Sequence, residues 1–282
     1  MRHRTLTRIW SGHGCVDILK WAVWCIALAG AAHAYGQKPD AQSVEESLKR
    51  VQQWQLHQGD LAEHRSDVRL LAQAGATQAI PALKDEFAAA KEIWLKLAIA
   101  SALVRLGDKD QVYWDFLADE ARAAVESDAP SIFLRDSEGR VDRNQREMAP
   151  EFIAWAKAHN LDRAAAAQAQ TFELPRNLFY LAETGDPRGR ELLRMGLKSH
   201  NTTIQSYAAK GLAKLRDKES VPLIIEAGRT MPREVAAFLV APALLFFDDP
   251  RAQSAGEMFI SDKRVLQELR SKIRPGADPF SY

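Results

Sequence analysis

Residues 181–187 read Leu-Ala-Glu-Thr-Gly-Asp-Pro, and this short stretch returns along the chain in modified form. The related stretches are LAQAGAT from Leu71, LVRLGDK from Leu103, LAKLRDK from Leu212 and LLFFDDP from Leu244. The first leucines are 32, 78, 31 and 32 residues apart, and an aspartate stands five residues after four of the five. A nearly constant period of this length is typical of repeat proteins.

The residue types of the repeated stretch predict the end of one helix and the start of the next. Gly75, Gly107 and Gly185 can adopt the left-handed backbone conformation that stops a helix. The aspartate that follows can accept backbone N–H groups at the start of the next helix. Pro187 and Pro250 come directly after it, at the first helical position, where a missing N–H costs nothing.

The segments between these stretches have the apolar spacing of helices. Apolar residues recur at intervals of three and four residues in 93–106, 109–125, 206–215 and 220–227. Small residues at the expected packing positions, such as Ala102 and Gly211, would let neighbouring helices approach closely. No segment alternates apolar and polar residues between hairpin turns, so we expect no sheet. The sequence therefore predicts an all-α fold.

The 78-residue interval between Leu103 and Leu181 is the exception to the period. We interpret it as two units plus an inserted loop at 126–149, which is polar and contains proline and glycine. The stretch WAKAHNLD at 155–162 resembles a degenerate copy of the repeated stretch. We expect the loop to be a tolerated surface insertion, although long loops in compact proteins often carry function.

The two ends of the repeat region have polar helical patterns. Segments 43–58 and 261–273 are expected to form helices that cover the first and last repeats, because an uncovered end would expose the core. Residues 274–282 are expected to form a flexible tail.

Residues 1–34 have the pattern of a secretory signal peptide. The basic residues Arg2, Arg4, Arg8 and Lys20 precede or border an uncharged run at 21–34 that ends in Ala-His-Ala. This run of 14 residues is shorter than the roughly 20 that a membrane-spanning helix needs. We therefore expect export to the periplasm or medium of a bacterial-type cell, with cleavage before Tyr35. The alternative is an uncleaved N-terminal anchor in the inner membrane.

Both cysteines, Cys15 and Cys25, lie inside this expected signal. The mature chain would therefore have no thiol, disulfide or thiolate metal ligand, which suits an oxidising compartment. Removal of the signal would leave 34 basic and 36 acidic residues.

The composition is that of an ordinary soluble protein. The chain has 282 residues, of which 46% are apolar and 27% charged, and its formal net charge is +1. This apolar content excludes disorder as the main state. The balanced charge is unfavourable for a nucleic-acid binder, which needs an excess of cations against phosphate.

Paired helices at a period of about 31 residues, joined by a Gly-Asp corner, resemble HEAT or HEAT-like repeats, including the group first noted in phycobilin lyase subunits. The resemblance covers about residues 60–260. It implies a right-handed α-solenoid of about six HEAT-like helical hairpins over 35–273, with polar terminal caps and one inserted loop. It also implies a protein-interaction scaffold, without implying a particular activity.

The sequence offers no catalytic, cofactor-binding or metal-binding group that stands above a structural explanation. His57, Asp60, Glu63 and His64 lie close together, but Gly59 separates the histidines, so we expect solvated surface side chains rather than a metal site. His200 is expected in a turn. Phosphate-binding glycine motifs do not occur in the sequence. We therefore expect a protein that is not an enzyme and has no cofactor.

One surface stripe is the candidate for partner binding. Residues two positions before or after the repeated leucines should stack along the concave side of a solenoid, which such proteins use to bind partners. We call the selected set the ridge; it consists of Arg69, Gln73, Arg105, Glu183, Lys210, Lys214 and Phe246. The expected partner is a protein or peptide.

Two other functions stay open. The second interpretation is an enzyme or a lyase-like accessory subunit with a ligand pocket between the 126–149 insertion and Trp155. A structural module of a larger envelope assembly is the third interpretation.

Overall fold

The computed structural model describes residues 39–54, 60–131, 150–273 and 277–281, and every regular element among them is helical. The expected signal segment, His57 and residues 132–149 of the expected inserted loop lie outside these ranges. The α-helices are α2 (Ala41–Gln53), α3 (Leu61–Ala74), α4 (Ile80–Ala89), α5 (Ile93–Arg105), α6 (Gln111–Glu126), α7 (Pro150–Ala158), α8 (Arg163–Gln168), α9 (Leu174–Thr184), α10 (Arg190–Gly196), α11 (Thr202–Lys214), α12 (Val221–Thr230), α13 (Arg233–Leu239), α14 (Ala241–Leu245), α15 (Pro250–Phe259) and α16 (Lys263–Lys272). A π-helical stretch (Ala169–Glu173) joins α8 to α9, and short 3₁₀ turns precede α4, α10 and α12.

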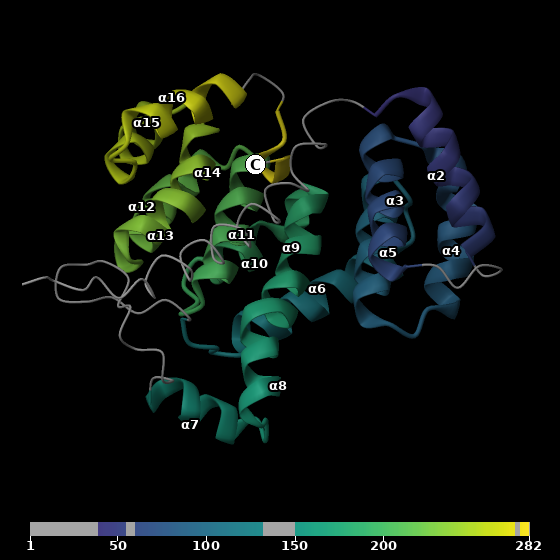
Figure 1. The fold of residues 1–282 in the computed structure, drawn as a ribbon, viewed down its shortest axis with the longest axis horizontal. Helices are drawn as coiled ribbons and strands as arrows, with labels where there is room; N and C mark the ends of the chain where they lie inside the picture. The colour runs from purple at the N-terminus through teal and green to yellow at the C-terminus, as the bar shows by residue number, and fades with distance from the viewer. Residues whose placement is uncertain (1–38, 55–59, 132–149, 274–276, 282) are drawn as a thin grey trace, which may run out of the picture. The chain divides into compact units, whose positions relative to one another are not determined.

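The helices form consecutive antiparallel pairs, as a HEAT-like solenoid requires (Figure 1). The pairs are α2/α3, α4/α5, α6/α9, α10/α11 and α12/α14, followed by α15 and α16. The second helices pack against one another in sequence, α3 on α5, α5 on α9, α9 on α11 and α11 on α14. We call α3, α5, α9, α11 and α14 the second-helix row. The expected all-α solenoid is confirmed.

Close helix approach in this row depends on small residues, as the sequence predicted. A Cβ atom placed on Gly211 in α11 would lie 2.9 Å from the Cβ of Ala182 in α9 and 2.9 Å from Leu193 in α10. A side chain at this position would separate the helices, and overpacking of this kind is destabilising.

The repeated stretches form the corners between pairs, and their leucines are deeply buried in the row. Leu71, Leu103, Leu181, Leu212 and Leu244 are all at most 1% exposed. In three corners the backbone N–H five residues after the leucine donates to the leucine carbonyl at 3.0 Å. Gly75, Gly107 and Gly185 have φ values of 70°, 83° and 64°. At Gly75 and Gly107 the left-handed residue is combined with this six-to-one hydrogen bond, which is the Schellman helix end, whereas after Gly185 the Asp186 N–H donates to the Thr184 hydroxyl.

The same left-handed turn also forms where the sequence lacks glycine. Arg216 has a φ of 53° in the corner after α11, and Asn160 has a φ of 54° after α7. The Leu161 N–H donates to the Ala156 carbonyl at 2.9 Å, which repeats the corner geometry. The stretch at 155–162 is therefore a true structural copy of the corner.

The corner aspartates were all expected to begin helices, and the structure shows two different uses. Asp186 and Asp249 accept the N–H groups of Arg188 and Arg251, each at 2.9 Å, as expected. Asp108 also accepts a backbone N–H, that of Asp110 at 2.9 Å, and it binds the Lys84 ammonium at 2.8 Å, but Asp110 is the residue that caps α6. Asp217 makes no capping bond.

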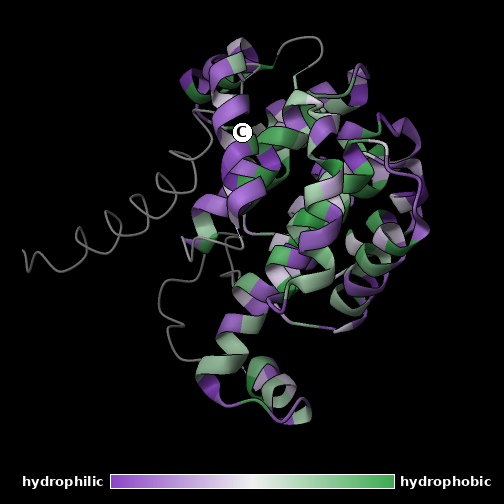
Figure 2. Cartoon of the chain, turned by 90° about the vertical axis from the view of Figure 1, so that its right-hand side faces the viewer, coloured by the Kyte–Doolittle hydropathy of each residue, from purple (hydrophilic) through white to green (hydrophobic). Residues whose placement is uncertain are grey.

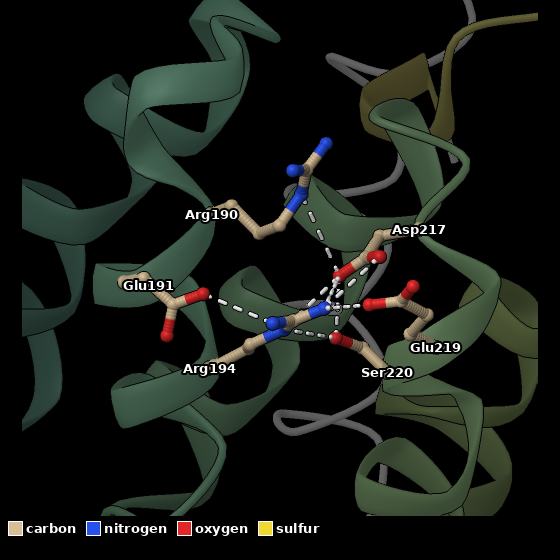
Figure 3. A network of polar contacts seen from close by, with 6 residues as sticks. All are labelled: Arg190, Glu191, Arg194, Asp217, Glu219 and Ser220. Atoms are coloured by element: carbon tan, nitrogen blue, oxygen red, sulfur yellow. Dashed lines mark hydrogen bonds and ion pairs between the residues drawn. The ribbon is translucent and has the colours of Figure 1, made fainter.

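The Asp217 carboxylate binds Arg194 of α10, in the α10/α11 pair that precedes this corner (Figure 3). Arg194 in α10 donates to the Asp217 carboxylate from Nη2 at 2.9 Å and to the Ser220 hydroxyl from Nε at 2.8 Å. Ser220 donates to the same carboxylate at 2.6 Å. Because Asp217 is only 8% exposed, these charge-assisted bonds compensate its burial. The corner aspartate here links α10 to the next corner.

The long interval between Leu103 and Leu181 contains one helix pair rather than the two that the spacing suggested. Helix α6 packs directly on α9, and α9 packs directly on α5 of the preceding pair. The extra residues form α7 and α8, which lie below the row in Figure 1 and have a separate small core around Phe152 and Trp155. The spacing between repeated stretches gives only the number of residues between them. It therefore cannot distinguish a further stacked helix pair from an inserted helical segment of similar length.

The two ends of the helical array are polar, as expected. Helix α16 has no buried residue, and α2 buries only Ser47 and Val51. Figure 2 shows hydrophobic residues gathered where helices face one another and hydrophilic residues on outward surfaces. One continuous core runs from Val51 to Phe280.

The left-handed corners predict opposite effects of two substitutions. A Cβ on Gly107 would meet no atom within 4 Å, so Gly107→Ala changes only backbone strain and should lower the free energy of unfolding by about 1 kcal/mol. Arg216→Gly relieves the same backbone strain at an exposed position and should raise the free energy of unfolding by about 0.5 kcal/mol. Urea unfolding measures both. A destabilising Arg216→Gly would contradict this account of the corner.

Candidate functional site

Three ridge residues from three different helices meet at one buried carboxylate. Glu183 in α9 is 1% exposed, and its Oε1 accepts Arg69 Nη2 of α3 at 2.6 Å. Arg105 Nη1 of α5 lies 3.3 Å from the same oxygen. A buried carboxylate needs such cationic partners, because an unpaired charge would be strongly unfavourable in the interior. This part of the ridge therefore ties successive helix pairs together.

An aromatic group continues the ridge towards α11. The ring centroid of Phe179 lies 5.2 Å from Tyr180, 5.1 Å from Tyr207 and 5.6 Å from Phe280, each pair in an edge-to-face arrangement. We call these four residues the Phe179 cluster. The Arg69 guanidinium lies 5.0 Å from the Phe179 centroid, so the cluster adjoins the Glu183 ion pairs.

The C-terminal segment 277–281 lies on the ridge. Lys214 Nζ is 2.6 Å from the Asp278 carboxylate and 5.6 Å from the Phe280 ring centroid. Phe280 is 9% exposed and belongs to the main core. Residues 274–282 were expected to form a flexible tail, whereas the structure packs 277–281 through one ion pair and one buried ring. An acidic residue followed at two positions by an aromatic one was the available sequence signal.

Lys210 is a half-buried cation one helical turn before Lys214. Burial lowers the pKa of its ammonium group to about 8, and the charge of Asp278 opposes this shift. The remaining ridge residues, Gln73 and Phe246, are both half-buried, and Phe246 packs against the main core. The structure thus brings together Arg69, Arg105 and Glu183 at one point and Lys210 and Lys214 at Asp278.

Near the N-terminus, the structure corrects the expectation that His64 is a solvated surface residue. His64 is 2% exposed, pairs with the buried Glu86 of α4, and stacks on Trp54 with a centroid distance of 3.8 Å. A pocket of about 130 Å³ beside it is lined partly by Arg50 and Asp67. Partners far along the chain, such as Glu86, are not visible in local spacing. Among the described residues no group of histidines, cysteines and carboxylates could hold a metal ion.

A larger groove lies where the sequence analysis placed an alternative ligand site. It has a volume of about 1000 Å³ and is lined by Trp155, His159, His200 and Thr202 among others. His200 Nδ1 is 2.9 Å from the Asp128 carboxylate, and both side chains are largely exposed. The Trp155 indole donates to the Ser127 carbonyl at 2.8 Å, which fixes α7 against the end of α6.

The lowered pKa of Lys210 predicts a specific pH dependence of stability. Below pH 8 Lys210 is protonated in both the folded and the unfolded state, so the unfavourable burial of its charge fully reduces the free energy of unfolding. Between about 8 and 10.5 the folded state releases the proton first, so the stability of the parent should rise with pH relative to Lys210→Met. Thermal melts of both proteins at pH 7 to 9.5 measure this difference. Parallel curves would exclude a lowered pKa.

The comparisons agree with the helical architecture. Residues 204–227, in α11 and α12, match the family model of the PBS lyase HEAT-like repeat. Neither a curated protein nor a solved structure matches the chain. No helix in the described part of the chain is long and apolar enough to span a bilayer. The matched segment contains the Leu212 corner, whose geometry recurs after α3 and α5. This segment is therefore similar to the PBS lyase HEAT-like repeat, and the all-α solenoid around it agrees with that similarity.

Proposed function

We propose that this protein is an exported, non-catalytic adaptor that binds a short segment of a partner protein on the ridge. HEAT-like repeats commonly mediate protein–protein interaction, which supports a protein partner. The observation that carries the proposal is the C-terminal segment 277–281, which the ridge already binds in the manner of a peptide.

The contacts of this segment define what the ridge recognises. Lys214 binds the Asp278 carboxylate, and Phe179 packs edge-to-face on the Phe280 ring two residues further on. Large buried aromatic rings and ion pairs at their edge are the usual anchors of protein interfaces. A partner segment with an acidic residue two positions before an aromatic one would make the same contacts and displace residues 277–281.

Export is the second part of the proposal. It rests on the basic start, the uncharged run and the Ala-His-Ala ending of residues 1–34, together with the absence of cysteine after Cys25. An adaptor in the cell envelope needs no thiol and no bound nucleotide.

An accessory subunit with a ligand site is the second candidate. The groove beside Trp155 and His159 supports it, since pockets of several hundred Å³ are typical of small-molecule sites. The ridge supports the adaptor better, because a bound segment shows which contacts are available there.

Peptide binding tests the adaptor function. A fluorescent peptide of residues 277–282 (ADPFSY) should bind Phe280→Ala at least about tenfold more tightly than the parent, whose own segment competes. Adding Lys214→Glu should abolish this binding by repelling the Asp278 carboxylate, whereas Lys218→Glu, an equal charge change at an exposed site, should not. Fluorescence anisotropy gives the affinities, and circular dichroism confirms the fold. Equal binding by both lysine variants would refute the ridge as the site.

Export has a separate test. The intact mass of the protein isolated from cells of its source should correspond to a chain that begins at Tyr35. A mass that includes residues 1–34 would favour the N-terminal anchor instead.

A further inference from the structure

A second group of cations lies on the same row, at the opposite ends of its helices from Glu183. Arg65 and Arg69 are one turn apart on α3, and Arg176 and Phe179 are one turn apart on α9. Trp94, at the start of α5, lies between these two helices. The Arg176 guanidinium is 4.1 Å from the Trp94 ring centroid, and the Arg65 guanidinium is 6.0 Å from it.

Arg176 is a partly buried cation without an acidic partner. Its Nη1 is buried and has no hydrogen-bond acceptor, and no ion pair joins Arg176 or Arg65 to a carboxylate among the described residues. Burial, with a smaller contribution from Arg65, lowers the pKa of Arg176, while Tyr180, Tyr207 and Glu173 act in the opposite direction. The nearby Glu173 carboxylate already accepts the Gln168 amide at 2.8 Å.

The stacking on Trp94 leaves the recognition edge of Arg176 unused. A cation–π contact employs the face of the guanidinium, whereas its N–H donors point outward in the plane. These in-plane donors are the ones that bind two oxygens of a carboxylate or phosphate. Stacking also holds the group in one orientation, so little conformational freedom remains to be lost on binding a ligand.

Two phenols supply further neutral donors beside it. Tyr180 is 5% exposed and Tyr207 is half-buried. Burial raises the pKa of both hydroxyls, so they stay protonated and able to donate. Both also belong to the Phe179 cluster, which places the Arg176 site next to the segment-binding part of the ridge.

We propose that Arg176, Arg65, Tyr180 and Tyr207 form a binding site for an oxyanion, a carboxylate or a phosphate group carried by the ligand of the ridge. The assignment of the oxyanion to a partner segment rests on the proposed function, whereas the site itself does not. A partner segment would then present an acidic residue to Lys214, an aromatic ring to the Phe179 cluster and a second anionic group to Arg176.

Titration of the full chain with inorganic phosphate and, separately, with acetate tests the site. The indole N–H signal of Trp94 in nitrogen-15 NMR spectra, assigned with Trp94→Phe, should move saturably with at least one of the two anions. Arg176→Met should weaken this response at least about tenfold, since it removes charged donors. Arg163→Met, at an exposed arginine on α8, should leave it unchanged. Response to one anion alone identifies a carboxylate or a phosphate as the ligand group.

Thermal melting without added anion gives an independent readout. A partly buried arginine whose charge is compensated only by a ligand lowers the stability of the protein without that ligand. Arg176→Met should therefore melt at the same temperature as the parent or higher. A clear loss of stability in Arg176→Met but not in Arg163→Met, or a Trp94 response that is linear or equal in both, would overturn the proposal.

The same variants separate this inference from the adaptor function. If Arg176→Met loses the anion response while the Lys214-dependent binding of the 277–282 peptide persists, both proposals stand. If the anion response persists in the parent but no peptide binds, the oxyanion site stands and its assignment to a partner segment fails.

Discussion

A left-handed residue four positions after a buried leucine, found in four of the five repeated corners, is the constraint on which the rest of the structure depends. It ends the second helix of one pair and turns the chain back, so that the first helix of the next pair can begin within a few residues. Because these four corners share this turn, the second helices that they end lie in register and pack on one another. Arg216 and Asn160 adopt this conformation without glycine, which shows that packing of the buried leucine and its neighbours outweighs the local backbone cost.

Regular stacking of the second-helix row brings charged side chains of different helices close together. Arg69 and Glu183 are 114 positions apart in the sequence, yet their side chains form an ion pair. The buried Glu183 has two cationic neighbours, so its charge is compensated within the fold. Arg176 lies over the face of Trp94 and forms no ion pair with a carboxylate in the described part of the chain, so its charge is not compensated there. The first arrangement serves the stability of the array, and the second is what a site for an anionic ligand requires.

The C-terminal segment links these two arrangements to function. It places a carboxylate on Lys214 and a ring on Phe179, next to Tyr180 and Tyr207. A protein that can bind its own acidic–aromatic segment on this face has the surface chemistry to bind a similar one from a partner. The groove beside Trp155 is lined by other residues, which come from the segment after α6, from α7, from the α10–α11 turn and from α12. The HEAT-like architecture itself is compatible with scaffolding and does not specify the partner.

The sequence by itself determined the helical class, the repeat and most of its corners, because helix ends depend on local residues such as Gly107, Asp186 and Pro250. The ridge stays a prediction as a partner-binding site, although equivalent repeat positions do meet at Arg69, Arg105 and Glu183. Only the tertiary structure decided that the 78-residue interval contains one pair, that His64 is buried against Glu86, and that residues 277–281 lie on Lys214. The unmatched charge of Arg176 also became visible only there. Each of these facts depends on contacts between residues far apart in the chain, and local propensity and spacing carry no information about which distant side chains meet.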